Sequence, residues 1–398
     1  MIPELNKGVV EIPEALSIFV NQIVYDKRSK GEYVYTYSLG EAYFDIPIFD
    51  IPNDVFVKGY HYSSSMGQPL LRKRIASLYS DHYGVSVNPD SEILVSTGSK
   101  PIIFMLMQAV LNAGDEVLVH EPAWLSYKEQ IKLAGGVHVP IPYNKSVYEW
   151  EEYITEKTKL IIVNNPNNPS GQLYSFDEFS YLLSLAEKHG LFILSDEAYS
   201  DFLMSEDKFI SFAAVDKSKE HCLVVNSLSK NMGMSGWRVG YTIAHENVIK
   251  QVLKLNQHLI TCAPTVLQDY MAAHFDEILR ATIPQAVSMA EKRSKVQAIL
   301  DEIGIPALPG VGTFYFLLNV SAFKGSTDEL VYDLLFNHNI ATVPGGAYGD
   351  STRDFIRFGI GVESLENIEK SLKIIKEFLS LQEYDNTLVR TQMAQYGI

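Results

Sequence analysis

Apolar runs and helical patterns alternate through the middle of the chain. The runs are rich in β-branched residues and mostly lack polar alternation: EILVS, EVLVH, VHVPI, KLIIVNN, LFILSD, CLVVNS and RVGYTIA. Helical patterns lie between several of them, at about residues 101–112, 124–133 and 176–189. Strands that are apolar on both faces are typical of parallel sheets covered by helices on both sides. We therefore expect an α/β fold with a mostly parallel, doubly wound sheet.

The pattern changes after about residue 245. Long helical stretches continue to about residue 303, and strand-like runs then alternate with helical patterns, at about 313–320, 327–338, 354–360 and 364–381. This arrangement predicts a smaller α+β domain built from both chain termini. We assign residues 48–290 to a large domain, and residues 1–47 and 291–398 to the small domain. From about residue 383 the sequence is polar and indicates a tail or an arm.

Composition and charge narrow the class of protein. The chain has 398 residues, 46% hydrophobic and 20% charged, which is enough to bury a core without covalent cross-links. The net charge of −15 argues against nucleic acid and anionic membranes as partners. Two cysteines are too few for a disulfide framework. No secretory signal or spanning segment is visible, so we expect a cytoplasmic protein. We expect no metal ion.

Lys230 follows the apolar run CLVVN and therefore lies where a strand is predicted to end. Ligands of open α/β sheets gather at the carboxyl ends of strands, and a partly desolvated lysine there is a competent amine nucleophile. Arg238 follows in the segment SLSKNMGMSGWRVGY, and its fixed fork of donors suits a phosphate. Ser227 and Ser229 add hydroxyl groups nearby. A lone lysine is usually a surface residue, but the glycines and the Trp-Arg pair of this segment favour a ligand site.

Asp196 ends another apolar run, in LFILSDEAYSDF. A carboxylate at a strand end can pair with a protonated ring nitrogen of a cofactor, and Tyr199 can hydrogen-bond a phenolic oxygen. From these residues alone, a helix-capping Asp with a packed Tyr is an equally good interpretation.

Two turns that follow predicted strands add further candidates. In NNPNNPSGQLYS, Asn168 can direct its amide into a site. In STGSKPII, a glycine turn opens a helix and presents free N–H groups to an anion, so Gly98, Ser99 and Lys100 are candidate phosphate donors. Each segment, taken alone, also fits an ordinary turn.

Taken together, these segments resemble a known family. NNPSG, DEAY and SLSKNMGMSGWRVGY, with the spacing from Asn168 to Asp196 to Lys230, are similar to the class I/II aminotransferases, the aspartate-aminotransferase-like enzymes of pyridoxal-phosphate (PLP) fold type I. The resemblance covers about residues 30–380. It implies PLP as cofactor and ping-pong transfer of an amino group between an amino acid and a 2-oxo acid. It also implies that Lys230 holds PLP as a Schiff base and moves the α-proton, and that Asp196 keeps the ring nitrogen protonated.

The resemblance assigns roles to several other residues. Asn168 and Tyr199 would tune the ring oxygen, while Arg238, Ser227 and the 98–100 turn would anchor the phosphate. In EPAWLSYKEQIKLAGG, Trp124 corresponds to the aromatic residue that stacks on the ring.

Three more segments resemble substrate or subunit contacts of the family. In YSSSMGQPLLRKRIA, Tyr62 corresponds to a tyrosine that reaches the phosphate of the neighbouring subunit, which implies a homodimer. LGEAYFDIP resembles the glycine loop near the substrate and brings in Gly40. DFIRFGIG resembles the strand whose arginine, here Arg357, holds the substrate α-carboxylate beside Asn168.

The chain departs from the family near the substrate entrance. His120, Glu121 and Ala123 stand where small or aromatic residues with prolines are common, and Ala42 and Tyr43 replace a commoner Pro-Asp. These departures leave the substrate open.

Lys100 carries a separate hypothesis. Some aspartate-type members have a lysine in a similar GGK segment, where it meets a distal carboxylate, which would make the substrate acidic. The alternative is that Lys100 points to solvent at the start of its helix.

Two other functions remain compatible with these residues. A PLP-dependent C–S or β-lyase would use Lys230 and Asp196 equally well. A non-enzymatic PLP-binding module of a regulator is disfavoured, because we find no added DNA-binding domain and both Lys230 and Arg238 are retained.

Overall fold

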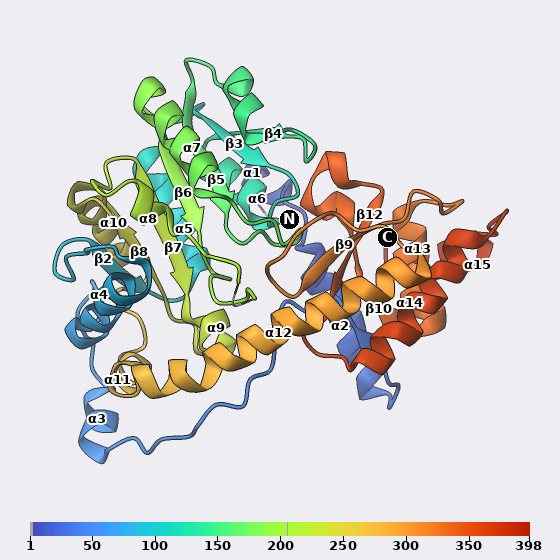
Figure 1. Cartoon of the computed structure of the whole chain (residues 1–398), viewed down its shortest axis with the longest axis horizontal. Coiled ribbons are helices and arrows are strands. Elements are labelled where there is room, and N and C mark those ends of the chain that lie inside the picture. Colours follow the sequence, from blue (N-terminus) through green and yellow to red (C-terminus); the bar gives the residue numbers. More distant parts are fainter. Residues whose placement is uncertain (1–2, 205) are drawn as a thin grey trace.

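A seven-stranded sheet forms the centre of the larger part of the molecule (Figure 1). The computed structural model describes residues 3–204 and 206–398. The strand order is β2-β8-β7-β6-β5-β3-β4, and all pairs are parallel except those of β8, which is antiparallel to β2 and β7. The strands are β2 (Ile93–Ser96), β3 (Glu116–His120), β4 (Val137–Ile141), β5 (Thr158–Asn164), β6 (Phe192–Asp196), β7 (Cys222–Ser227) and β8 (Gly240–Ala244). The predicted mostly parallel α/β sheet is confirmed.

Helices cover both faces of this sheet because its inner strands are apolar on both sides. Side chains alternate along a strand, so Leu160 and Ile162 pack on one face of β5 while Ile161 and Val163 pack on the other. One face is covered by α4 (Pro69–Tyr83), α7 (Phe176–His189), α8 (Phe212–Val215) and α11 (Thr265–Ala273). The other is covered by α5 (Ser99–Val110), α6 (Ser126–Leu133) and α10 (Glu246–Leu259).

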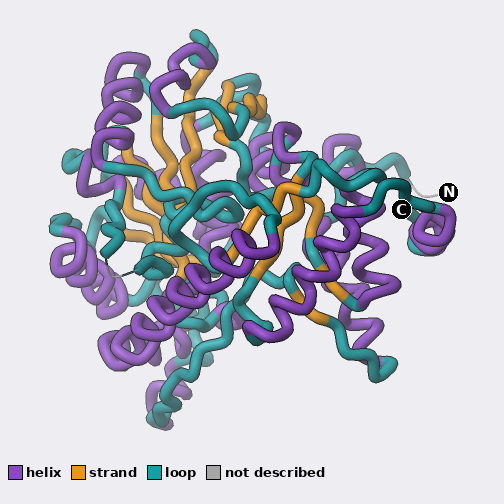
Figure 2. The backbone as a smooth tube through the Cα atoms, turned by 45° about the vertical axis from the view of Figure 1, so that its right-hand side comes forward, coloured by secondary structure: helices purple, strands orange, loops and turns teal. Residues whose placement is uncertain are grey.

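The smaller part is built on a three-stranded antiparallel sheet, and Figure 2 shows the two groups of strands apart from each other. Its order is β11 (Val343–Pro344), β12 (Phe355–Gly359) and β9 (Tyr315–Asn319). The helices α12 (Phe275–Ile303), α13 (Thr327–His338) and α14 (Leu365–Ser380) pack on it. The N-terminal stretch joins this part, because β1 (Tyr35–Thr36) pairs with β10 (Ile340–Ala341) and α2 (Leu16–Ser29) packs beside α13. The domain boundaries at residues 47 and 290 remain a prediction.

Helix α12 runs along both parts of the molecule, as Figure 1 shows in orange. Arg293 lies in its middle and is only 3% exposed. Its guanidinium donates to the carbonyls of Gly310 (3.0 Å), Ser170 (3.3 Å) and Tyr315. Burial lowers the pKa of Arg293 to about 9. These contacts tie the turn after β5 to the start of β9, so that residues from both parts can share one site.

The N-terminal chain beyond β1 crosses beneath α12 in Figure 1 before it enters α3 (Asn53–Lys58). The backbone of Asp45 forms two hydrogen bonds of 2.8 Å with the side-chain amide of Gln285: Asp45 N donates to Oε1, and Nε2 donates to Asp45 O. Phe49 N donates to Tyr270 Oη at 2.9 Å. This path carries the segment around Gly40 to the carboxyl ends of the central strands.

The C-terminus differs from the expected polar tail. Residues Thr387–Gln395 form helix α15, which packs on α13 and buries Val389. The buried carboxylate of Glu329 accepts hydrogen bonds from Arg390 Nε (2.7 Å) and Asn386 Nδ2 (2.8 Å). The segment is thus an ordered arm, docked by Val389, Met393 and one ion pair although it is polar on average. Among residues 3–204 and 206–398, no helix is long and apolar enough to cross a membrane.

Candidate active site

The predicted site residues converge at the carboxyl ends of β5, β6 and β7. Asn168 lies in the turn after β5, Asp196 ends β6, and Lys230 lies in α9 (Leu228–Asn231) directly after β7. These strands are adjacent and parallel, so their ends meet at one edge of the sheet. The structure therefore brings together three residues that are far apart in sequence.

Lys230 is the buried amine of this site. Its Nζ donates to the carbonyl of Gly40, and it lies 5.9 Å from the centre of the Tyr199 ring. Burial lowers the pKa of Lys230 to about 8; Arg357 and Arg238 add to the lowering, while Glu41 opposes it. A substantial fraction of this amine is therefore neutral near physiological pH, as a nucleophile or proton acceptor requires.

Asp196 is the buried carboxylate beside it, 6% exposed. It accepts hydrogen bonds from Tyr127 Oη (2.7 Å) and Ala198 N (3.2 Å). Burial raises the pKa of Asp196 to about 6, and the two hydrogen bonds limit that rise. Sequence reasoning missed Tyr127, which lies three residues after Trp124 at the start of α6.

Tyr199 is held between two side chains. Asn168 Nδ2 donates to its hydroxyl at 3.3 Å, and the hydroxyl of Tyr315 lies 3.1 Å away. The buried Oδ1 of Asn168 has no hydrogen-bond partner among the described residues. Burial raises the pKa of Tyr199 well above its usual range, so the phenol stays protonated. Tyr315 was not predicted, because only the folding of β9 onto the larger part brings it here.

The turn at Gly98 and the guanidinium of Arg238 form a second part of the site, which we call the anion corner. Gly98 has φ +86°, and a Cβ there would lie 2.5 Å from Arg238 Nη2. Arg238 Nη1 donates to Ser235 O (2.9 Å) and Ser229 Oγ (3.4 Å). Ser99 begins α5, and Gly98 supplies no side-chain cap, so the first-turn N–H groups are open to an anion.

Ser227 has a structural contact in this corner. Its hydroxyl oxygen accepts a hydrogen bond from Ser229 N at 3.2 Å, and it thereby caps α9. It is the hydroxyl of the other serine, Ser229, that accepts a hydrogen bond from Arg238. Ser227 lies one turn from Lys230 and retains its own hydroxyl proton for a ligand.

Lys100 is exposed at the start of α5 and also contacts an aromatic ring. Its ammonium lies 5.0 Å from the centre of the Trp124 ring. Partial burial lowers the pKa of Lys100, and repulsion from Arg238 lowers it further. Trp124 itself packs edge-on against Tyr127, with ring centroids 5.2 Å apart. The stacking candidate, the anion corner and the partner of Asp196 are thus neighbours.

Arg357 lies on β12 of the smaller part and faces the same site. It is 4% exposed, and its guanidinium lies between the rings of Tyr315 (4.7 Å) and Tyr348 (5.1 Å). Nη2 donates to Ser38 O at 2.5 Å, while Nε has no partner among the described residues. The two rings therefore hold the guanidinium in a fixed plane, and its free N–H groups are available to a carboxylate. Neither Tyr348 nor Ser38 was predicted.

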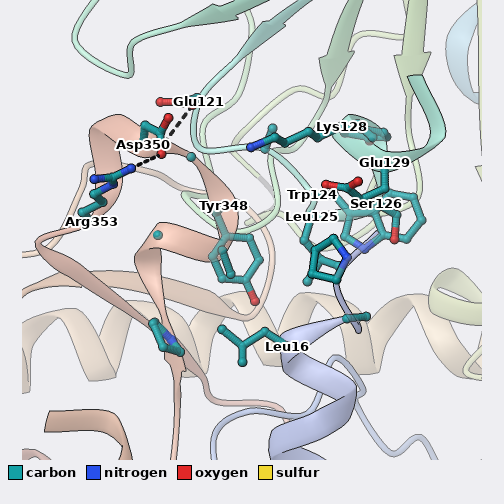
Figure 3. A pocket seen from close by; sticks show the side chains of 18 of the residues that line it. Leu16, Glu121, Trp124, Leu125, Ser126, Lys128, Glu129, Tyr348, Asp350 and Arg353 are labelled. Carbon is teal, nitrogen blue, oxygen red and sulfur yellow. Dashed lines mark hydrogen bonds and ion pairs between the residues drawn. The ribbon is translucent and has the colours of Figure 1, made fainter. Parts of the chain in front are cut away.

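A cavity of about 950 Å³ adjoins the site at Trp124 and Tyr348, although neither Lys230 nor Arg357 lines it (Figure 3). Figure 3 shows Leu16, Trp124 and Tyr348 around it, each from a different segment of the chain. The N-terminal residues 12–16, the segment that follows β3 and the loop before β12 line its walls. The space is large enough for the side chain of a small substrate.

Tyr62 is the one predicted residue that lies outside this cluster. It is 86% exposed and lines a surface hollow of about 700 Å³. The same hollow is lined by Thr97, which precedes Gly98. Within a single chain, Tyr62 therefore contributes nothing to the buried site.

Comparisons with known proteins agree with this geometry. The family model for aminotransferase class I and II matches residues 57–375. A probable aspartate/prephenate aminotransferase of Aquifex aeolicus is 32% identical over 372 residues, 87% of this chain and 93% of that protein. Aromatic-amino-acid aminotransferase 2 of Thermococcus litoralis is 30% identical, over 89% of this chain and 95% of that protein. Aspartate aminotransferase from Thermus thermophilus with maleate superimposes with a TM-score of 0.84 at 28% identity, covering 95% of this chain and all of that one.

The chain belongs to the class I and II aminotransferases. The predicted resemblance is confirmed, together with the α/β fold that it implied. Enzymes of this family depend on PLP and transfer amino groups between amino acids and 2-oxo acids. The names of the relatives support amino-group transfer over the lyase alternative.

The hydrogen bond from Tyr127 to Asp196 gives a test by pH. Because this bond lowers the pKa of Asp196, Tyr127→Phe should raise that pKa from about 6. A hydrogen bond to a charged group is worth about 1.5–3 kcal/mol, so the pKa of Asp196 should rise by about one to two pH units. The measurement is a pH titration of the Asp196 carboxyl by NMR in the cofactor-free protein. An unmoved titration would show that Tyr127 does not stabilise the ionised carboxylate.

Proposed function

We propose that this chain catalyses amino-group transfer between an amino acid and a 2-oxo acid, with PLP held by Lys230. The supporting observation is that a buried amine, Lys230, and a buried carboxylate, Asp196, lie at the ends of adjacent parallel strands. Burial moves their pKa values toward neutrality from opposite sides. Groups with shifted pKa values that gather at one edge of a sheet are typical of catalytic sites.

The residues of the site fit PLP on three separate points. The corner at Gly98, Ser99 and Arg238 offers open N–H groups and a guanidinium to a phosphate. Asn168 Nδ2 and Tyr199 Oη carry donors for a phenolic oxygen, and the unpartnered Asn168 Oδ1 can accept a hydrogen bond from a ligand hydroxyl. Asp196 is an acceptor for a protonated ring nitrogen. When bound, PLP supplies a sink for the electrons released from the α-carbon of the substrate.

The remaining roles follow from the positions of the side chains. Lys230 takes a proton from the α-carbon and returns it, which a pKa of about 8 allows near neutral pH. Arg357 holds the α-carboxylate with a paired set of donors, while its hydrogen bond to Ser38 O fixes the guanidinium and Gly40 O accepts from Lys230. Trp124 provides a flat surface beside the anion corner. One site thus serves the two half-reactions in turn, as a ping-pong mechanism requires.

We also propose that the enzyme is a homodimer. Tyr60, Tyr62 and Leu259 are 70%, 86% and 57% exposed and line one hollow, although they are large and apolar. Such surfaces are typical of protein interfaces. Because the hollow also reaches Thr97, a tyrosine from a second copy could approach the phosphate corner from outside. The two free cysteines are consistent with a reducing location such as the cytoplasm.

The proposed cofactor chemistry predicts a spectroscopic cycle. Purified enzyme should show a visible absorption band that an amino donor bleaches and a 2-oxo acid restores. Lys230→Ala should lack this band in the absence of amines and lose activity by about 10²–10⁴-fold, because the general base is removed. Lys254→Ala, on an exposed face of α10, is the matched control.

Two other results would contradict this prediction in different ways. Bleaching that oxo acids never reverse, with ammonia accumulating, would favour a lyase. The absence of a visible band after addition of PLP would overturn the proposed cofactor.

Lys100 is proposed to serve the anion corner. It lies over Trp124 and is repelled by Arg238, so a bound phosphate would relieve the repulsion between two cations. Lys100→Ala should weaken PLP retention by about tenfold, equivalent to about 1.4 kcal/mol. It should lower kcat/KM for aspartate and phenylalanine by the same factor, with exposed Lys132→Ala as control. A loss with aspartate and glutamate that spares alanine and phenylalanine would instead assign Lys100 to a distal carboxylate.

The proposed dimer predicts rescue between two inactive variants. In a mixed dimer of Lys230→Ala and Tyr62→Ala subunits, one site keeps both its own Lys230 and the neighbour's Tyr62. Refolded mixtures should therefore recover about half of the wild-type activity per mixed dimer, as two-fold symmetry dictates. If mixed dimers are no more active than the Tyr62→Ala homodimer, Tyr62 does not serve the neighbouring site.

A further inference from the structure

The carboxylate of Glu121 connects the larger part of the molecule to the loop that precedes β12. Glu121 follows β3 directly and is 4% exposed. Its Oε1 accepts a hydrogen bond from Asp350 N (2.9 Å), and its Oε2 accepts from Ser351 N (2.9 Å) and Ser351 Oγ (2.6 Å). A buried carboxylate needs such donors, so separating the loop from Glu121 would leave it unsatisfied.

The backbone reinforces this contact. Ala123 N donates to Tyr348 O at 2.8 Å, which joins the same two segments beside the carboxylate. Gly349 lies so close that a Cβ there would be 2.4 Å from Glu121 Cδ. The loop therefore docks in one position, and its glycine is required for the approach. We call residues 348–351 the docked loop.

The docked loop places Tyr348 in the wall of the cavity, next to Arg357. Tyr348 is 2% exposed, its ring lies 5.1 Å from the Arg357 guanidinium, and its buried hydroxyl has no partner among the described residues. Figure 3 shows Tyr348 at the cavity, with Glu121 and Asp350 above and to the left of it. Trp124 lies on the opposite wall and follows Glu121 closely in the chain. Glu121 thus links the segment that carries Trp124 to the loop that carries Tyr348.

We propose that Glu121 is a positioning residue for substrate binding, which rests on the function proposed above. By holding the docked loop, it keeps Tyr348 against Arg357 and leaves the Tyr348 hydroxyl free for the bound substrate. An arginine that packs on an aromatic ring presents its donors in a fixed plane, which favours paired contacts with a carboxylate. Loss of the carboxylate should therefore weaken substrate binding and leave proton transfer at Lys230 intact.

The first test is Glu121→Gln in the PLP-bound enzyme. The amide keeps the size of the side chain but turns one acceptor into a donor that opposes Ser351. We expect KM for the amino acid to rise about tenfold or more while kcat stays within about twofold, as lost ground-state binding predicts. The Kd of an α-methyl amino acid, which binds without losing an α-proton, should rise equally when followed by the visible band. Exposed Glu152→Gln is the matched control and should change neither value.

A second pair of variants tests whether Glu121 acts through the docked loop. Ser351→Ala removes the shortest of the three hydrogen bonds and should raise Kd in the same direction. Tyr348→Leu should reproduce the effect of Glu121→Gln, and the double variant should bind about as weakly as either single one. Such non-additivity is expected only when both residues act as one unit.

The outcomes separate positioning from general stability. An unchanged KM and Kd in Glu121→Gln, with or without a lower Tm, would overturn the proposal. Fully additive effects of Glu121→Gln and Tyr348→Leu on Kd would also overturn it. If the wild-type enzyme shows no amino-group transfer, the proposed function fails first and this inference fails with it. A normal wild type with unaffected variants would reject only the role of Glu121.

Discussion

The inner strands of the central sheet are buried on both faces, and this constraint determines where chemistry is possible. A polar or charged side chain within β5, β6 or β7 would be removed from water on either face of the sheet, which costs free energy. They are placed instead where the strands end, and parallel pairing brings those ends to one edge. Asp196 and Lys230 therefore lie together because of the hydrophobic core that precedes each of them.

The same burial sets the electrostatics of the site. Desolvation disfavours the charged form of each group, so it raises the pKa of Asp196 to about 6 and lowers that of Lys230 to about 8. Tyr127 restrains the first change, and Glu41 opposes the second. At one and the same pH, the carboxylate of Asp196 is therefore ionised while the amine of Lys230 is partly neutral. Few added groups are needed because the low-polarity surroundings do most of the tuning.

The site also depends on contacts between two parts of the molecule. Arg293 joins Ser170 to Tyr315, while Glu121 joins β3 to the loop that carries Tyr348. Arg357 comes from the smaller part, and the amine of Lys230 meets Gly40 from the N-terminal stretch. The cavity beside Trp124 is therefore a product of the assembled chain, with walls from segments that share no local sequence pattern.

The sequence by itself determined the fold class and the residues at strand ends. Apolar runs predicted the sheet, Asp196 and Lys230 followed from their places after those runs, and Arg238 followed from the glycine-rich segment after Lys230, because such patterns are local. Tyr127, Tyr315, Tyr348 and the contact of Glu121 with Ser351 were decided only by the tertiary structure. The docking of α15 through Val389 and Glu329 belongs to the same group. Each of these depends on pairing between distant segments, and hydrogen bonds between such segments leave no periodic signal in the chain.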